Sequence, residues 1–148
     1  MLRNILLVYQ HNKFFQKAFE VALDLAKKYQ ARLHFFVLMN RDYLSYQSSV
    51  ESAPQFQELR EFQKIAFQSG IDSVIFTSCG DLAVSVSHYV QNEHCDLVVI
   101  GKRHFQQGRN TIYFDAVDYI IKYLDCSLIV VKDAITHQQS SSEVTLQC

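Results

Sequence analysis

Five short, mostly apolar stretches recur along the chain and predict buried strands. They cover residues 4–9, 31–38, 72–77, 96–100 and 127–131. Near-continuous apolarity is expected of strands whose two faces are both covered, as in a parallel sheet flanked by helices. The pattern therefore predicts an α/β protein.

The segments between these stretches have the periodicity of amphipathic helices. The first is predicted to begin at an Asn12 cap and to end near Lys27 and Lys28, which suit the negative end of a helix dipole. The last is predicted to follow Asp115. Their expected apolar faces are Phe15, Ala18, Phe19, Ala22, Leu25 and Ala26 in the first, and Ala116, Tyr119, Ile120 and Tyr123 in the last.

Two further helices lie between these. One is predicted from Pro54, a favoured first-turn residue, to a stop at Gly70, and the other from a cap at Asp81. Strands and helices thus alternate, and right-handed crossovers convert that order into a doubly wound sheet. Such sheets bind ligands at the carboxyl ends of the strands, beside the point where the strand order reverses.

The length and charge of the chain bound the possible functions. With 148 residues, of which 49% are hydrophobic, one compact domain is expected, over residues 1–133. Residues 134–148 are rich in Ser and Gln and are expected to form a mobile polar tail. A net charge of -1 gives no broad basic surface, so nucleic acid is not expected as a partner.

The cellular setting follows from what the chain lacks. No apolar run approaches the roughly 20 residues of a membrane helix, and the amino-terminal segment lacks an export signal, so we expect a cytoplasmic protein with no membrane contact. The four cysteines, without a CxxC motif, are then expected to be free thiols. Adjacent residues rarely chelate together, so His94 and Cys95 are predicted to form a turn, and no metal site is expected.

Four segments, in order along the chain, resemble the universal stress protein family. They are "NILLVY", "ALDLAKKYQARLHFFVL", "SCGDLAVSVSHYVQNEHCDLVVIGKRH" and "LDCSLIVVK". The resemblance implies a three-layer domain with a five-stranded parallel sheet of order 3-2-1-4-5 and helices on both faces, like that of the adenine nucleotide alpha hydrolases (the HUP class). It also implies a homodimer that acts in stress adaptation without well-defined catalysis.

The family contains nucleotide binders and a subfamily, similar to universal stress protein A, that is taken not to bind ATP. Binders carry an Asp at the end of the first strand and a loop G-x2-G-x9-G-[S/T] after the fourth. In this sequence Gly101 matches the first glycine, whereas His104, Phe114 and Asp115 stand at the later loop positions and Gln10 stands at the strand position. The resemblance therefore implies the subfamily with a degenerate loop and no tight ATP binding.

The loop chemistry gives the same answer on physical grounds. Glycines let main-chain N–H groups approach a phosphate, and a Cβ at these positions adds bulk and restricts the backbone. Phe114 would exclude a phosphate from the start of the helix, and the Asp115 carboxylate can accept the same amide hydrogens. Against this, Lys102, Arg103 and Arg109 are expected to bring positive charge to the same crevice at the carboxyl ends of the strands.

Two readings of the crevice therefore stay open. In the first, no cofactor is bound. In the alternative, ATP or AMP binds weakly at a phosphate site rebuilt around Gly108, Arg109 and Asn110. Leu38, at the carboxyl end of the second strand, completes the set of candidate crevice positions. No catalytic residues are predicted, and a slow ATPase is the exception to consider.

Two segments are candidates for protein contacts. The last strand, Ser127 to Val131, should lie at an edge of the sheet, and its free backbone groups could pair across a twofold axis to form the homodimer. The loop from Tyr43 to Tyr46 places aromatic side chains in a polar segment, so it either covers the second helix or contacts a partner. A third hypothesis, a redox or flavin module on this type of sheet, depends on Cys79 near a helix start and on these loop aromatics.

Overall fold

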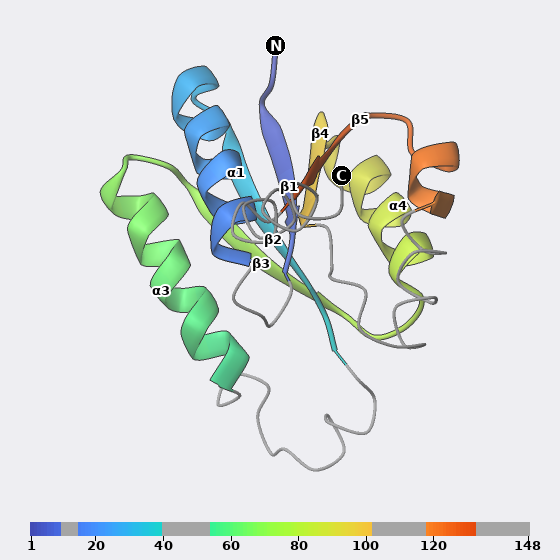
Figure 1. Ribbon diagram of the computed structural model, residues 1–148, viewed down its shortest axis with the longest axis horizontal. Helices are drawn as coiled ribbons and strands as arrows, with labels where there is room; N and C mark the ends of the chain where they lie inside the picture. The colour runs from blue at the N-terminus through green and yellow to red at the C-terminus, as the bar shows by residue number, and fades with distance from the viewer. Residues whose placement is uncertain (10–14, 40–53, 102–117, 133–148) are drawn as a thin grey trace, which may run out of the picture.

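A five-stranded, all-parallel sheet forms the centre of the molecule in the computed structural model, which describes residues 1–9, 15–39, 54–101 and 118–132 (Figure 1). The strands lie in the order β3-β2-β1-β4-β5, so the expected order is confirmed. They are β1 (Asn4–Val8), β2 (Arg32–Leu38), β3 (Ser73–Ser78), β4 (Leu97–Gly101) and β5 (Ser127–Val131).

Helices cover both faces of this sheet. Helices α1 (Phe15–Tyr29) and α3 (Pro54–Gln68) pack on one face, and α4 (Leu82–Glu93) packs on the other together with the helical residues 118–123 (Figure 1). The three-layer α/β architecture predicted from the alternation of strands and helices is therefore confirmed.

The central strand shows why its sequence is apolar throughout. Ile5 and Leu7 of β1 belong to the core beneath α1 and α3, whereas Leu6 and Val8 belong to the core beneath α4, and all four are at most 2% exposed. Side chains alternate between the faces of a strand, so a strand covered twice must be apolar at every position. Each such side chain contributes about 1.5–3 kcal/mol through burial.

The helix ends follow from individual residues. Asp81 caps α4, because its Oδ1 accepts a hydrogen bond of 3.0 Å from the backbone N–H of Val84. Beyond α3, Gly70 has φ of +79°, a conformation that favours glycine, and it ends the helix as predicted. His94 adopts a left-handed conformation after α4, which confirms the predicted turn at His94–Cys95. The expected Asn12 cap lies outside the described residues.

Two details differ from the sequence-based expectation. Gly101 is the last residue of β4 and is buried, so the loop begins after it. In helical residues 118–123 only Ile120 is buried, whereas Tyr119 and Tyr123 are 42% and 63% exposed with ring centroids 4.6 Å apart. The predicted apolar face was wrong for these tyrosines, because in residues 118–123 only Ile120 points fully into the core.

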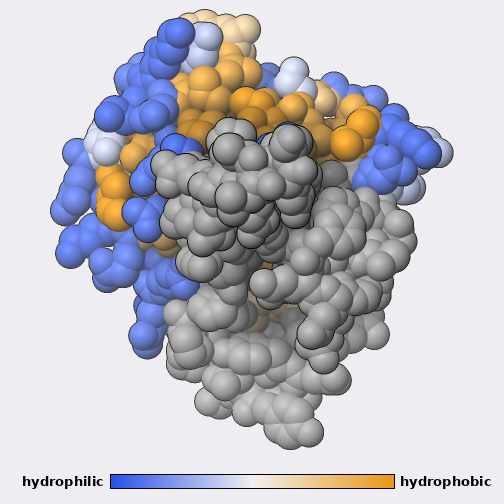
Figure 2. All heavy atoms as spheres, viewed as in Figure 1, coloured by the Kyte–Doolittle hydropathy of each residue, from blue (hydrophilic) through white to orange (hydrophobic). Residues whose placement is uncertain are grey.

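The surface separates polar from apolar regions. Figure 2 shows polar side chains along the left of the view, over α1 and α3, and apolar side chains across its upper part. The solvent-facing sides of these helices are therefore mainly polar, as expected of amphipathic helices on a covered sheet. The exceptions on α3 are Ile65 and Phe67, which are 44% and 79% exposed.

Candidate functional site

The strand order locates the candidate ligand crevice. Strand β1 is hydrogen-bonded to β2 on one side and to β4 on the other, so the chain order reverses at β1. In a doubly wound sheet a ligand binds outside the carboxyl ends of the strands at this point. Here these ends are Val8, followed by Tyr9, and Gly101. The predicted loop after Gly101 therefore starts at the expected place.

Tyr9 holds the end of β1 against the helices of one face. The residue is 8% exposed, and its ring meets Phe15 edge-on, with centroids 4.8 Å apart. Its backbone N–H donates to the Phe36 carbonyl oxygen at 2.8 Å, and its side chain forms a hydrogen bond with Glu58. Burial, and then the Glu58 charge, raise the pKa of the Tyr9 phenol well above its ordinary value.

Tyr9 is therefore a neutral structural group beside the crevice, because a phenol with a raised pKa does not act as a base near neutral pH. It was assigned only to the strand from the sequence. The signal for a special role was a tyrosine directly after an otherwise aliphatic strand. The sequence could not identify its partners, because Phe15 and Glu58 come from two different helices.

Two of the predicted crevice positions are described. Leu38 is the last residue of β2 and is 38% exposed, and Gly101 is buried at the end of β4 beside Val131. The other predicted positions lie outside the described residues, as do the loop from Tyr43 to Tyr46 and the carboxyl-terminal tail. These positions are Gln10, His104, Gly108, Arg109, Asn110, Phe114 and Asp115.

The start of α4 also lies at the carboxyl end of the sheet, next to β3. A helix start attracts anions through its free N–H groups and its dipole. Here the Asp81 carboxylate already accepts the Val84 N–H, and the Ser78 and Ser85 hydroxyls bond to each other at 3.1 Å. A carboxylate of the chain itself thus takes an amide that a phosphate would use.

The cysteines in the described part of the chain are free thiols. Cys79 is exposed and Cys95 is buried. Burial chiefly, and then the neighbouring Cys126, raise the pKa of Cys95 to about 12, and burial with Asp96 and Asp125 raises the pKa of Cys126 to about 11. Both thiols are protonated at neutral pH and are weak nucleophiles. Among described residues, no group of His, Cys, Asp and Glu is arranged to hold a metal ion.

A buried polar cluster lies at the opposite, amino-terminal end of the strands. The His34 side chain is bonded through Nδ1 to the Tyr89 hydroxyl at 2.7 Å and through Nε2 to Asn4 Oδ1 at 2.9 Å. The backbone N–H of Asn4 in turn donates to an Asp96 carboxylate oxygen at 2.9 Å. This cluster joins β1, β2 and α4, far along the strands from the crevice, so we assign it a structural role.

No helix among the described residues is long and apolar enough to cross a bilayer. The sequence matches the universal stress protein family over residues 1–132. Among proteins with curated descriptions, none matches it.

Solved structures of universal stress proteins share the fold. UspA from Lactobacillus plantarum superposes with a TM-score of 0.66 at 21% identity, covering 88% of this chain and 97% of that one. A universal stress protein in complex with cAMP gives 0.69 at 14% identity, covering 88% and 97%. The AMP-bound family member At3g01520 from Arabidopsis thaliana gives 0.59 at 16% identity, covering 89% and 93%.

These identities are low enough that the structural likeness shows the fold alone. The family match covers nearly all of the chain and reaches one residue beyond β5. The chain therefore belongs to the universal stress protein family.

Proposed function

We propose that this protein is a non-enzymatic, cytoplasmic stress-response protein that acts as a homodimer and does not bind ATP tightly. The observation that carries the proposal is the loop that leaves Gly101. It departs from the crevice of an intact universal stress protein fold, yet His104, Phe114 and Asp115 replace the residues that a phosphate requires.

The size of the effect favours exclusion of ATP. A phosphate and a carboxylate about 4 Å apart, at an effective dielectric constant of about 20, repel by about 4 kcal/mol. This repulsion weakens binding about a thousandfold. The loop sequence also contains the cations Lys102, Arg103 and Arg109. A cation screened by solvent and salt recovers at most about 1 kcal/mol. Asp81 supports the same logic, since it caps α4 with a carboxylate at this end of the sheet.

The homodimer is proposed to form through β5. This strand lies at the edge of the sheet, it contains no charged residue, and its Val130 is 38% exposed. An uncharged edge strand invites pairing with another strand. Two copies related by a twofold axis would satisfy each other's free backbone groups.

The alternative function is binding of a nucleotide, ATP or AMP, at a phosphate site rebuilt around Gly108, Arg109 and Asn110. The fold relatives in complex with cAMP and AMP favour this alternative, because this chain shares their fold. A slow ATPase would be an extension of it.

Calorimetric titration with ATP, AMP and cAMP tests the proposal. We expect no saturation of the wild-type protein at micromolar nucleotide. The triple variant His104→Gly, Phe114→Gly, Asp115→Ser restores the binding pattern and should gain affinity for ATP by on the order of a thousandfold.

Arg109→Ala in the wild-type background serves as the control for the alternative. Micromolar saturation by ATP or AMP in the wild type, abolished by Arg109→Ala, would overturn the first proposal and establish the rebuilt phosphate site.

A further inference from the structure

Strand β3 forms the second edge of the sheet, and one side of its backbone faces outward. Leu33 N–H donates to Asp72 O and Met39 N–H donates to Ser78 O, so the backbone groups of the even-numbered residues face β2. In a strand the N–H and C=O of alternate residues point to opposite sides. The backbone groups of Ser73, Ile75 and Thr77 therefore point away from the sheet.

Only the first of these outward positions has a bonding partner in the described part of the chain. The Gln63 side-chain amide of α3 donates to the Ser73 carbonyl oxygen at 3.2 Å. Ile75 and Thr77 make no outward hydrogen bond to any described residue. Natural edge strands are usually protected by charges, prolines or bulges, but β3, with the sequence SVIFTS, has no charge and no proline.

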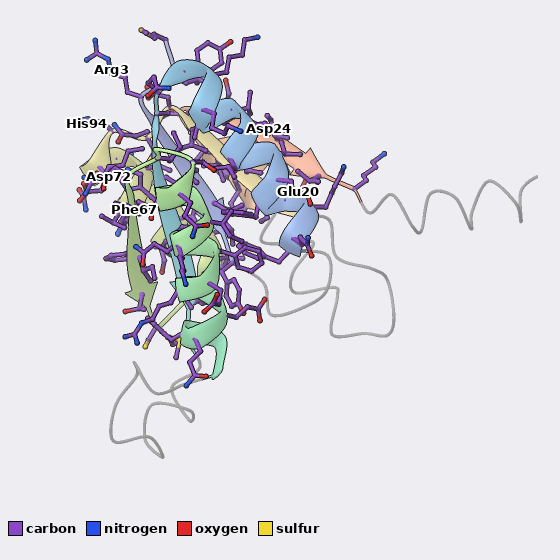
Figure 3. The ribbon with its side chains drawn as sticks, turned by 90° about the vertical axis from the view of Figure 1, so that its left-hand side faces the viewer. Arg3, Glu20, Asp24, Phe67, Asp72 and His94 are labelled. Carbon is purple, nitrogen blue, oxygen red and sulfur yellow. The ribbon has the colours of Figure 1, made fainter. Side chains whose placement is uncertain are left out.

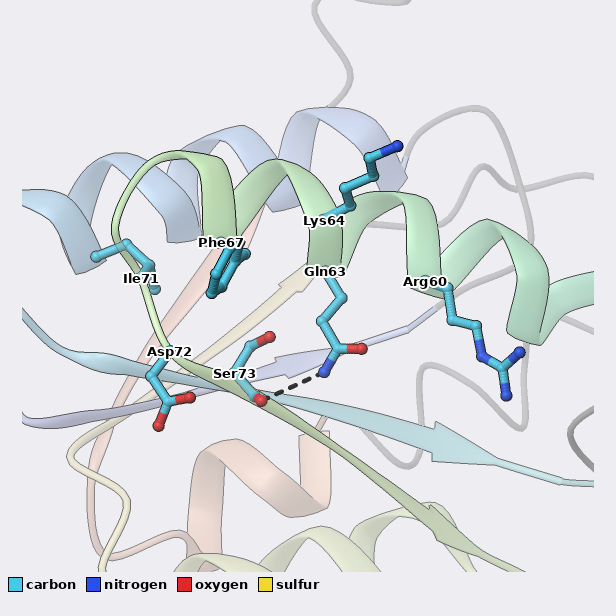
Figure 4. A pocket seen from close by; sticks show the side chains of 7 residues that line it. All are labelled: Arg60, Gln63, Lys64, Phe67, Ile71, Asp72 and Ser73. Carbon is cyan, nitrogen blue, oxygen red and sulfur yellow. Dashed lines mark hydrogen bonds between the residues drawn. The ribbon is translucent and has the colours of Figure 1, made fainter.

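A groove runs beside this edge. Its volume is about 340 Å³, and its walls come from one face of α3 and from the start of β3. The residues from α3 are spaced three or four apart, so they lie along one side of the helix. Figure 4 shows Gln63 and Phe67 projecting from α3 toward β3, and Lys64, which is exposed, projecting away from β3. The lining residues are Arg60, Gln63, Lys64, Phe67, Ile71, Asp72 and Ser73.

The floor of the groove is apolar and unusually open to water. Phe67 is 79% exposed although it is a large aromatic side chain, and Ile71 beside it is buried. Phe67 and Asp72 lie on the same side of the molecule, next to β3 (Figure 3). An exposed aromatic ring next to free strand backbone is typical of a peptide-binding surface.

The charge of the groove is positive. Arg60 and Lys64 contribute two cations from adjacent turns of α3. Among the described lining residues the acidic group is Asp72, which pairs with Arg32, with Nε and Oδ2 3.1 Å apart. An acidic partner would therefore be attracted to this edge and a basic partner repelled.

We propose that the outer edge of β3 and the α3 groove form a docking site for an acidic peptide segment in an extended conformation. The segment adds a sixth strand by pairing with the outward N–H and C=O groups of Ile75 and Thr77. Its acidic side chains lie toward Arg60 and Lys64, and an apolar side chain covers Phe67. This mode needs no nucleotide and leaves β5 available to a second copy of the chain.

The charge pattern distinguishes this occupant from another copy of the protein. The strand at the opposite edge, β5, has the sequence SLIVV and carries no acidic residue. It complements the backbone of β3 but not the cations of α3, so an acidic segment fits better.

The test uses a labelled, capped peptide of alternating valine and glutamate about as long as β3, with a valine and lysine peptide as its counterpart. We expect fluorescence anisotropy to show binding of the glutamate peptide that weakens with added salt. The lysine peptide should not bind. Equal binding of both peptides, or of neither, would overturn the proposal.

Amide hydrogen exchange locates the contact. In the free protein the amides of Val74 and Phe76 should be protected by β2, whereas those of Ile75 and Thr77 should exchange quickly. Glutamate peptide at about ten times its Kd should slow exchange at Ile75 and Thr77 about tenfold. Protection of these two amides without peptide, or peptide-induced protection confined to β5, would contradict the site.

Two variants separate backbone pairing from charge. Thr77→Pro removes an outward N–H without touching the bonds to β2 and should abolish binding, while unchanged thermal unfolding shows that the fold is intact. Lys64→Glu should lower the affinity for the glutamate peptide by on the order of tenfold. Lys17→Glu on α1 should leave that affinity unchanged. The proposal would be overturned if Thr77→Pro bound the peptide like the wild type. It would also be overturned if the Lys64→Glu protein differed from the wild type in the mass of its assembly in solution, because a second copy of the chain would then be the occupant.

Discussion

His34 is held in its neutral form by its surroundings. The residue is 2% exposed, and Asn4 Oδ1 can only accept, so Nε2 carries the proton and Nδ1 accepts from the Tyr89 hydroxyl. Burial, and then the Arg32 charge, lower the pKa of His34, while Glu93 and Asp72 oppose this shift more weakly. A second proton, on Nδ1, would remove the acceptor of the hydrogen bond from the Tyr89 hydroxyl.

The pH dependence of stability follows with a definite sign. The folded state keeps the pKa of His34 below the value of about 6.5 expected in the unfolded chain. As the pH falls below about 6.5, the unfolded chain therefore takes up a proton before the folded protein does, and the free energy of unfolding decreases. Above that pH both states are neutral and the contribution is constant.

Urea unfolding of the wild type and of His34→Gln, measured from about pH 7.5 to about pH 5, tests this expectation. The wild type should lose stability more steeply below about pH 6.5 than the variant, which has no titrating group at this position. His88→Gln, at an exposed position of α4, should keep the wild-type slope. Parallel curves for the wild type and His34→Gln would refute the assignment.

The sequence could show His34 only as an unassigned histidine in an apolar strand. Its partners Tyr89 and Asn4 are 55 and 30 positions away along the chain, and no local sequence pattern shows that three elements meet at one side chain. Asp81 was easier to predict, because a cap and its amide are only three residues apart.

At the scale of elements, the end of α4 stores local backbone strain. His94 has φ of 54° and ψ of 48°, and its backbone N–H donates to the Val90 carbonyl oxygen to close the helix. A residue with a Cβ pays about 1–2 kcal/mol in this left-handed region, whereas glycine does not. His94 is exposed, so packing of its side chain offsets little of this strain energy.

His94→Gly should therefore stabilise the protein by about 0.5–1 kcal/mol, after the greater freedom of glycine in the unfolded chain is subtracted. His88→Gly makes the same chemical change in the middle of α4 and should instead destabilise by about 0.5 kcal/mol. Chemical denaturation of both variants measures the two signs. A loss of stability in His94→Gly would show that the imidazole has a role at this helix end.

Element boundaries were predicted to within about a residue where apolar runs are sharp, as for β5, and helix ends were predicted where a special residue marks them, as at Gly70. The exposure of the tyrosines in residues 118–123 was not predicted, because their helical spacing is the same whether the helix is deeply or only partly buried. For the candidate site, the sequence located the end of β4 to within one residue of Gly101, whereas the loop residues that follow lie outside the described residues and stay a prediction.

At the scale of the whole molecule, the strand order came from the family resemblance, because apolar periodicity identifies strands without ordering them. Once that order is known, both edges are defined: β3 on one side and β5 on the other. The two edges differ in their surroundings. Cations of α3 border β3, whereas β5 is uncharged and offers the exposed side chain of Val130.

This asymmetry leads to a prediction about assembly. Sedimentation equilibrium should give about twice the 17.2 kDa of one chain, because two uncharged β5 edges can pair. Val130→Lys places like charges on both sides of that interface and removes two apolar side chains from it. Together these effects should raise the dimer dissociation constant by on the order of a hundredfold.

Val84→Lys is the matched control, because this valine on α4 is 44% exposed, close to the 38% of Val130, but lies on a helix that presents no free strand backbone. It should leave the dimer intact. A monomeric wild type would rule out the β5 dimer, and dissociation of Val84→Lys with an intact Val130→Lys would move the interface to α4. Since α4 and β5 belong to different layers of the fold, the two variants decide which layer of the molecule faces its partner.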